Sequence, residues 1–156
     1  MNQNNGFVLL FAVMLSSIIL AIALGVASVA LKEINFSTSA KDANNAFYSA
    51  DTGIECALFN DKPPLAIFPN NASQQVTCLG GFININSTDW TNGPWNFVLP
   101  GLGSSNDSCA IIDVTKVTVN GSLSTTIISK GYNNGGGFGG CTPNSSSVER
   151  ELQVTY

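Results

Sequence analysis

Four cysteines are the residues of this chain best able to form covalent bonds: Cys56, Cys78, Cys109 and Cys141. No two of them form a CxxC pair, and the chain has no histidine, so their spacing does not suit a zinc site. An even number of cysteines beyond an apolar segment is typical of disulfides in an oxidising compartment. Of three possible connectivities we favour Cys56–Cys78 with Cys109–Cys141, each stabilising by ~3 kcal/mol. Four reduced, buried thiols are the alternative.

Other groups that support catalysis are sparse. The lack of histidine excludes Ser–His and Cys–His nucleophiles, and neither a G-x-S-x-G turn nor a phosphate-binding loop occurs. Asp89, Asp107 and Asp113 lack the dense spacing of calcium ligands. Trp90 and Trp95 could form an exposed ligand surface, although packing in a core or turn is the simpler interpretation. We therefore expect no enzymatic activity, no metal and no cofactor.

The charge distribution argues against nucleic-acid binding. The 156 residues carry a formal net charge of −4. The six cations are scattered along the chain: Lys32, Lys41, Lys62, Lys116, Lys130 and Arg150. Binding to a phosphate backbone requires cations clustered on one face, and this sequence predicts no such face.

The longest uninterrupted apolar segment is residues 7–31, FVLLFAVMLSSIILAIALGVASVAL, which contains no charge and no proline. As a helix it would extend ~37 Å, enough to cross a hydrocarbon core of ~30 Å. A cleaved secretory signal would have a shorter apolar core, a cationic start and a cleavage site after that core. The segment therefore predicts a single-pass membrane anchor, and a simple signal anchor is one interpretation of it.

The two indications of membrane orientation conflict. Lys32 and Lys41 follow the apolar segment and would place the C-terminal part inside the cell under the positive-inside rule. The cysteines favour the opposite side, and Glu33 offsets the nearer lysine. We therefore expect the C-terminal part to be extracytoplasmic.

Residues 32–60 continue the helical pattern, with a single apolar stripe that should pack on a sheet. The stripe consists of Phe36, Ala40, Ala43, Phe47, Ala50, Ile54, Ala57 and Leu58. Pro63 and Pro64 end the helix. Asp51 and Glu55 fall on other faces, where they are either solvated or paired with Lys130 or Arg150.

After the prolines the pattern becomes that of strands. Residues 82–86 and 95–99 are short candidates, and residues 110–130 form a hairpin around Asn120 and Gly121. Residues 148–156 alternate strictly, as expected for a half-buried strand. The loop 131–147 would be tied down by a Cys109–Cys141 bridge. The sequence therefore predicts an α+β fold, with a long helix on an antiparallel sheet of about four strands and a globular β domain at 61–156.

The N-terminus resembles that of a type IV prepilin: a six-residue polar leader ending in Gly6, then FVLLFAVMLSSIILAI. The resemblance implies that a prepilin peptidase cuts after Gly6 and methylates the amine of Phe7. It also implies a precursor held in the inner membrane, followed by assembly with other pilin subunits into a cell-surface filament by the pilus assembly machinery.

A second segment, AFYSADTGIECAL, resembles a helix of PilX-like minor pilins and K-type minor pseudopilins. The matching residues are Phe47, Tyr48, Ala50, Asp51, Gly53, Ile54 and Glu55, with Asp51 where Glu is usual. Two departures stand out: the leader has no basic residue, and Phe11 occupies the fifth position after the cut, where major pilins carry Glu. The resemblance thus implies a minor structural subunit of a pilus or secretion filament. A membrane-anchored extracellular binding domain that never polymerises is the alternative.

Overall fold

The structure, a computed structural model, describes residues 5–63, 65–68, 75–89, 91, 93–137 and 139–156. Its elements are, in order, α1 (Asn5–Asp61), β1 (Gln75–Cys78), β2 (Gly81–Asn84), β3 (Asn86–Ser87), β4 (Trp95–Leu102), β5 (Ser108–Val119), β6 (Ser122–Tyr132) and β7 (Glu149–Thr155). The chain divides into two compact units, residues 1–40 and 41–156.

In the first unit, residues 7–40 are helical throughout and every one of them is exposed. The predicted helix is confirmed over this range. It needs no tertiary support to satisfy its backbone, because the bonds of a helix join residues of the same segment.

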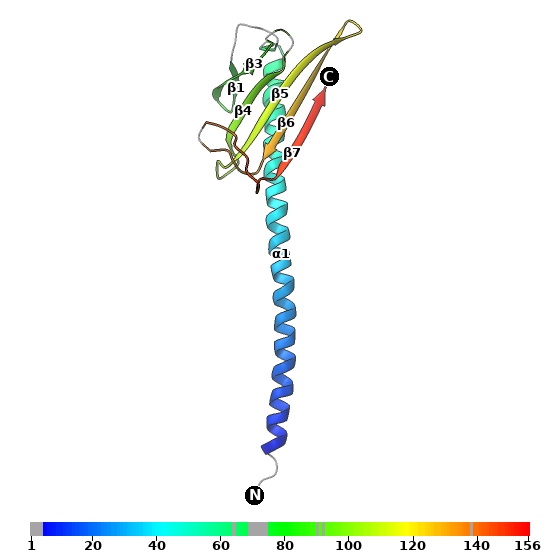
Figure 1. The fold of residues 1–156 in the computed structure, drawn as a ribbon, viewed down its shortest axis with the longest axis vertical. Coiled ribbons are helices and arrows are strands. Elements are labelled where there is room, and N and C mark those ends of the chain that lie inside the picture. The colour runs from blue at the N-terminus through cyan, green and yellow to red at the C-terminus, as the bar shows by residue number, and fades with distance from the viewer. Residues whose placement is uncertain (1–4, 64, 69–74, 90, 92, 138) are drawn as a thin grey trace. The chain divides into compact units, whose positions relative to one another are not determined.

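In the second unit, strands β3 to β7 form one five-stranded antiparallel sheet in which each strand pairs with the next along the chain (Figure 1). Strands β1 and β2 form a separate hairpin. The α+β arrangement of a long helix and an antiparallel sheet is therefore confirmed. The expected number of about four strands in this sheet was too low by one, because β3 has only two residues and so shows no alternating pattern.

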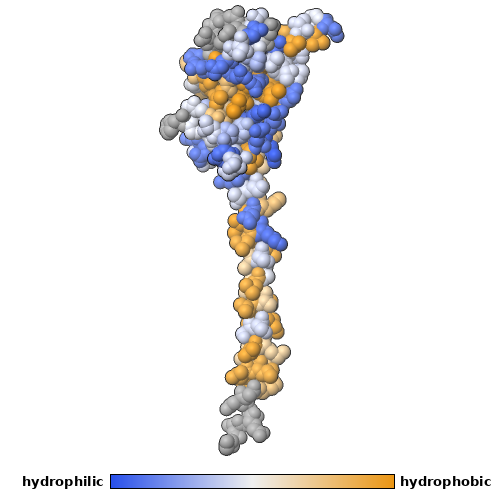
Figure 2. Space-filling model, viewed as in Figure 1, coloured by the Kyte–Doolittle hydropathy of each residue, from blue (hydrophilic) through white to orange (hydrophobic). Residues whose placement is uncertain are grey.

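The predicted hairpin is formed by β5 and β6, which pair from Cys109 with Tyr132 up to Val119 with Ser122. Asn120 and Gly121 form its turn, with φ of 52° and 82°, as such turns require. The hairpin extends past its neighbours, since β4 pairs only as far as Val114 and β7 only from Thr126. Apolar side chains near its tip are exposed (Figure 2): Val117, Val119 and Leu123.

The helix segment of the second unit packs on the sheet through small residues. Ala46, Ala50 and Ala57 are fully buried. Opposite them, Gly131 of β6 lies so close to the helix that a Cβ there would overlap the backbone of Ala46 and Ala50. At Gly53 a Cβ would meet side chains of the sheet in the same way. Small side chains on both surfaces thus let helix and sheet approach closely.

This close approach corrects the predicted stripe. Phe36 is 77% exposed and Phe47 is 43% exposed, although both were expected on the packed face. Phe36 belongs to the first unit, where residues 7–40 are all exposed, and so does Ala40 of the predicted stripe. In the second unit the helix buries only small residues next to Gly131, namely Ala46, Ser49 and Ala50, and Phe47 lies at the surface. Ala50, Ile54 and Ala57 are buried as expected.

Strand β4 supplies the largest side chains of the core. Trp95, Phe97 and Leu99 alternate inward, and Phe68 packs on both aromatic rings, at centroid distances of 5.6 Å to Trp95 and 6.4 Å to Phe97. Core packing was the interpretation favoured for Trp95, and it is confirmed. Trp90 lies outside the described residues.

Candidate functional site

The apolar segment 7–31 is the first candidate site, because its side chains have no partner within the described chain. Helix α1 contains a span long and apolar enough to cross a membrane, and none of its most apolar window is buried. Phe7 is 76% exposed and Phe11 58%. Exposed apolar surface of this extent marks contact with lipid or with other proteins.

The few polar side chains of this segment are satisfied locally. Ser16 donates to the carbonyl of Val13 at 3.0 Å, and Ser17 donates to the carbonyl of Met14 at 2.8 Å. Ser28 donates to the carbonyl of Gly25 at 2.9 Å. Because each hydroxyl is bonded within its own helix, the serines add little cost to an apolar environment.

The proposed processing position lies at the start of α1. The helix begins at Asn5, so it contains both Gly6 and Phe7, while residues 1–4 lie outside the described part. Phe11, one turn later, is also exposed. Cleavage and methylation remain predictions.

The second resembling segment serves partly as core and partly as surface. Ala50, Gly53 and Ile54 are buried against the sheet. Phe47 and Tyr48 face outward, with their rings in an edge-to-face pair at a centroid distance of 5.8 Å. The segment therefore combines the contact with the sheet and an exposed aromatic pair.

The carboxylates of this segment do not find the suggested partners. Within the described residues neither Asp51 nor Glu55 forms an ion pair, and Lys130 instead pairs with Glu151 of the adjacent strand at 3.6 Å. Arg150 is exposed. The solvated interpretation of Asp51 and Glu55 is the one that agrees with the structure.

Both favoured cysteine pairs are present, each with a Cα–Cα distance of 5.6 Å: Cys56 with Cys78 and Cys109 with Cys141. The first joins α1 to β1. Beside it the fully buried Asn60 donates from its amide to the carbonyl of Thr77 at 3.0 Å and accepts from the Thr77 amide at 3.1 Å. The Cys56–Cys78 disulfide and the side-chain amide of Asn60 together hold the β1–β2 hairpin against the helix.

The second disulfide joins the start of β5 to the long loop between β6 and β7. The same loop is held by backbone bonds, because Gly136 donates to the carbonyl of Asp107 at 2.7 Å and Gly101 donates to the carbonyl of Gly136 at 3.0 Å. The prediction that Cys109–Cys141 ties down this loop is confirmed.

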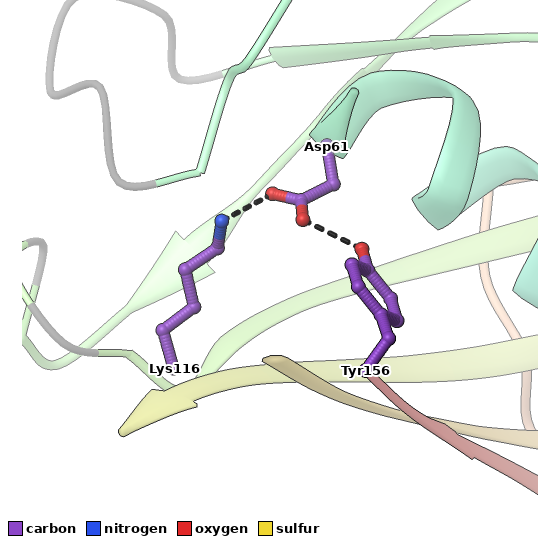
Figure 3. Close-up of polar contacts among 3 residues, drawn as sticks. All are labelled: Asp61, Lys116 and Tyr156. Atoms are coloured by element: carbon purple, nitrogen blue, oxygen red, sulfur yellow. Dashed lines mark hydrogen bonds and ion pairs between the residues drawn. The ribbon is translucent and has the colours of Figure 1, made fainter. Parts of the chain in front are cut away.

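A buried polar cluster was not anticipated. The Lys116 ammonium lies 2.6 Å from the Asp61 carboxylate, and the Tyr156 hydroxyl donates to the other oxygen of Asp61 at 2.6 Å (Figure 3). The side chains of Lys116 and Asp61 are only 8% and 4% exposed. The cluster joins the last residue of α1 to β5 and to the residue following β7. One signal was available, since Lys116 continues the inward positions of Ile112 and Val114 at a spacing of two.

Burial perturbs three acidic groups of the second unit. It raises the pKa of Tyr156, with a further contribution from the bond to Asp61, and it raises the pKa of Tyr132 to about 12, aided by Glu149. Burial also raises the pKa of Asp113, against the lowering effect of Lys130. Asp113 accepts from the side-chain amide of Asn96 on the neighbouring strand.

Among the described residues no group of three or more His, Cys, Asp or Glu could hold a metal ion. Comparison of the chain with protein-family models, with curated proteins and with solved structures gives no match.

Proposed function

We propose that this chain is a minor type IV pilin-like structural subunit of a pilus or secretion filament. The observation that carries the proposal is helix α1, which begins beside Gly6 and Phe7 and provides an entirely exposed apolar segment. In its last turns the same helix forms one wall of a disulfide-linked domain. Segment 7–31 would anchor the precursor in the inner membrane and then join other subunits in the filament.

The apolar surface gives the physical support for this role. Transfer of each large apolar side chain of the segment out of water is favourable by ~1.5–3 kcal/mol of free energy. Lipid and neighbouring apolar helices both supply such an environment, so transfer from membrane to filament costs little hydrophobic free energy. The satisfied hydroxyls of Ser16, Ser17 and Ser28 suit either environment.

Phe11 supports a minor position in the filament. A carboxylate at this place would neutralise the α-amine of a neighbouring subunit, and a buried ammonium without that partner would cost several kcal/mol. A subunit with Phe there is best accommodated where no amine has to be neutralised. We therefore expect this chain to be far less abundant in filaments than the main subunit.

The decisive experiment is the intact mass and N-terminal sequence of the protein from its native cells. A chain that begins with N-methylated Phe7 supports the proposal, and a chain that retains the leader contradicts it. A Gly6→Leu variant is the matched control and should retain the leader while keeping the same disulfides. Quantitative mass spectrometry of sheared filaments then measures abundance.

The alternative, a membrane-anchored extracellular binding domain, predicts a different pair of results. The leader would be retained, and the protein would stay in the membrane fraction when filaments are sheared from the cells. Both measurements use the same preparation, so one culture separates the two functions.

A further inference from the structure

Two adjoining clefts lie at one end of the sheet in the second unit. The larger has a volume of about 680 Å³ and is bounded by the start of the unit's helix segment, the β4–β5 loop and the β6–β7 loop. The smaller, about 320 Å³, shares Asn45, Gly103 and Ser108 with it and continues to Tyr48. The two loops emerge at the same end because Cys109 of β5 pairs with Tyr132 of β6 (Figure 1). Both volumes lie in the range of small-molecule sites, ~300–1,000 Å³.

The lining of the larger cleft is polar throughout. Its side chains are hydroxyls, amides, carboxylates and one ammonium, and the rest of the wall is glycine. Within the described chain, four side chains of the lining form no hydrogen bond or ion pair: Lys41, Asp42, Asn45 and Asp107. Their donors and acceptors are therefore available to a ligand in the cleft. An apolar ligand would leave these groups unpaired and is disfavoured.

The walls of the cleft are held in place. Ser108 donates to the carbonyl of Asn133 at 3.0 Å, and the amide of Val148 donates to the Asn133 side-chain oxygen at 2.7 Å. The Cys109–Cys141 bridge joins the residue that follows Ser108 to the β6–β7 loop. At Gly136 a Cβ would overlap the backbone of Ser108, so the β6–β7 loop directly contacts the backbone at the start of β5. A fixed wall reduces the ordering cost of binding a flexible polar ligand.

Charge and aromatic surface narrow the ligand class. One ammonium and two carboxylates line the larger cleft, which leaves no positive excess to hold an anion. In the smaller cleft the ring of Tyr48, 65% exposed, offers a flat face beside the polar groups. Mixed donors and acceptors next to an aromatic face suit a molecule with hydroxyls around an apolar ring face.

The geometry points to a binding site for neutral oligosaccharides, with hydroxyl groups bonded in the larger cleft and one sugar ring against Tyr48. This inference goes beyond the structural role proposed above and does not depend on it, because the site lies wholly within residues 41–156.

The test uses the full chain in micelles of a zwitterionic detergent without a sugar head group. Lactose, maltotriose and N,N′-diacetylchitobiose are titrated separately to about 10 mM, with ligand-observed NMR and calorimetry as readouts. At least one of the three should bind with a Kd of about 0.1–5 mM. Asn45→Ala and Asp107→Ala should each weaken that binding by about three- to tenfold.

Two variants at Tyr48 and one remote variant sharpen the result. Tyr48→Phe should retain most of the affinity and Tyr48→Ala should lose it, because only the alanine removes the ring. Thr118→Ala, exposed near the hairpin tip, is the matched control and should bind as the parent does. Thermal unfolding and disulfide mapping establish that each variant is folded.

Three outcomes would overturn the inference. The first is that none of the three sugars binds at the highest concentration. The second is that the variants in the clefts bind as well as Thr118→Ala. The third is that the anionic sugar 3′-sialyllactose, or a cationic chitosan oligomer, binds more tightly than the neutral sugars.

Discussion

Helix α1 has the same backbone conformation in residues 7–40 as in residues 41–61, but its side chains have different surroundings in the two segments. In the first segment every residue is exposed. In the second, Ala46, Ala50 and Ala57 are fully buried, Cys56 is bonded to Cys78, and Asp61 is paired with Lys116. Helix formation and helix burial are therefore separate properties: local sequence supports the first, and neighbouring elements of the chain supply the second.

The largest effect should come from the buried ion pair at the end of the second segment. Asp61→Ala leaves the Lys116 ammonium buried without a counter-charge and should lower the free energy of unfolding by about 3–5 kcal/mol. Denaturant unfolding of the second unit measures it. The double variant Asp61→Leu with Lys116→Met removes both charges, and its free energy of unfolding should fall much less. Equal losses in the two variants would show that the charges do not interact.

The next effect concerns the covalent attachment of the same segment. Replacing Cys56 and Cys78 by Ser opens a ring with a sequence separation of 22 and should cost ~3 kcal/mol. Hydrogen exchange should then quicken in the last turns of α1 and in β1, and stay unchanged in residues 7–40. Faster exchange in residues 7–40 would contradict the separation of the two segments.

A smaller loss is expected where helix and sheet approach most closely. Gly131→Ala would place a methyl group against the backbone of Ala46 and Ala50 and should cost ~1–3 kcal/mol. Gly81→Ala is the control, because its nearest neighbour would be a carbonyl at 3.8 Å. Thermal unfolding compares the two. If both variants have the same melting temperature, the close approach of helix and sheet does not limit the size of the side chain at Gly131.

In the first segment the same substitution should have the opposite sign. A Cβ on Gly25 meets nothing within 4 Å, so Gly25→Ala gains helix propensity of up to ~1 kcal/mol without a clash. Amide exchange around residue 25, measured in micelles, should slow. An acceleration there would mean that residues 7–40 are packed against something that the alanine disturbs.

The smallest effect is a pH dependence confined to the second unit. Because burial and Asp61 raise the pKa of Tyr156, the unfolded chain releases this proton first as pH rises above about 10. Stability should therefore be constant with respect to this group below that pH and should fall above it. Tyr156→Phe should reduce the alkaline slope. Tyr132→Phe is a second probe, since the pKa of Tyr132 is raised to about 12.

Features carried by local sequence were predictable. The long apolar helix, the turn at Asn120 and Gly121, and the strand near the end of the chain all follow from spacing within a few residues. The cysteine pairing also followed, because each favoured bridge closes a loop between successive cysteines.

Features that depend on contacts between distant residues were not predictable from the sequence. The inward position of Lys116 is explained by Asp61, 55 residues earlier, and the outward position of Phe47 by Gly131 on β6. A charged residue in an alternating strand is normally assigned to the solvent face, and a phenylalanine in a helix to the core. For Lys116 the alternation with Ile112 and Val114 indicates the inward face, but only the distant Asp61 explains how a charge is accommodated there. For Phe47 the deciding partner, Gly131, is far away in the chain.

The order of the disulfides has a consequence for how the protein matures. Each cysteine is bonded to a neighbour in sequence, so the two covalent rings, 56–78 and 109–141, are separate and do not interleave. A chain exported from its N-terminal end presents Cys56 first and Cys78 second, and can close the first ring before Cys109 arrives. If the domain is exported as proposed, oxidation in order of emergence yields both native pairs directly, without exchange between disulfides.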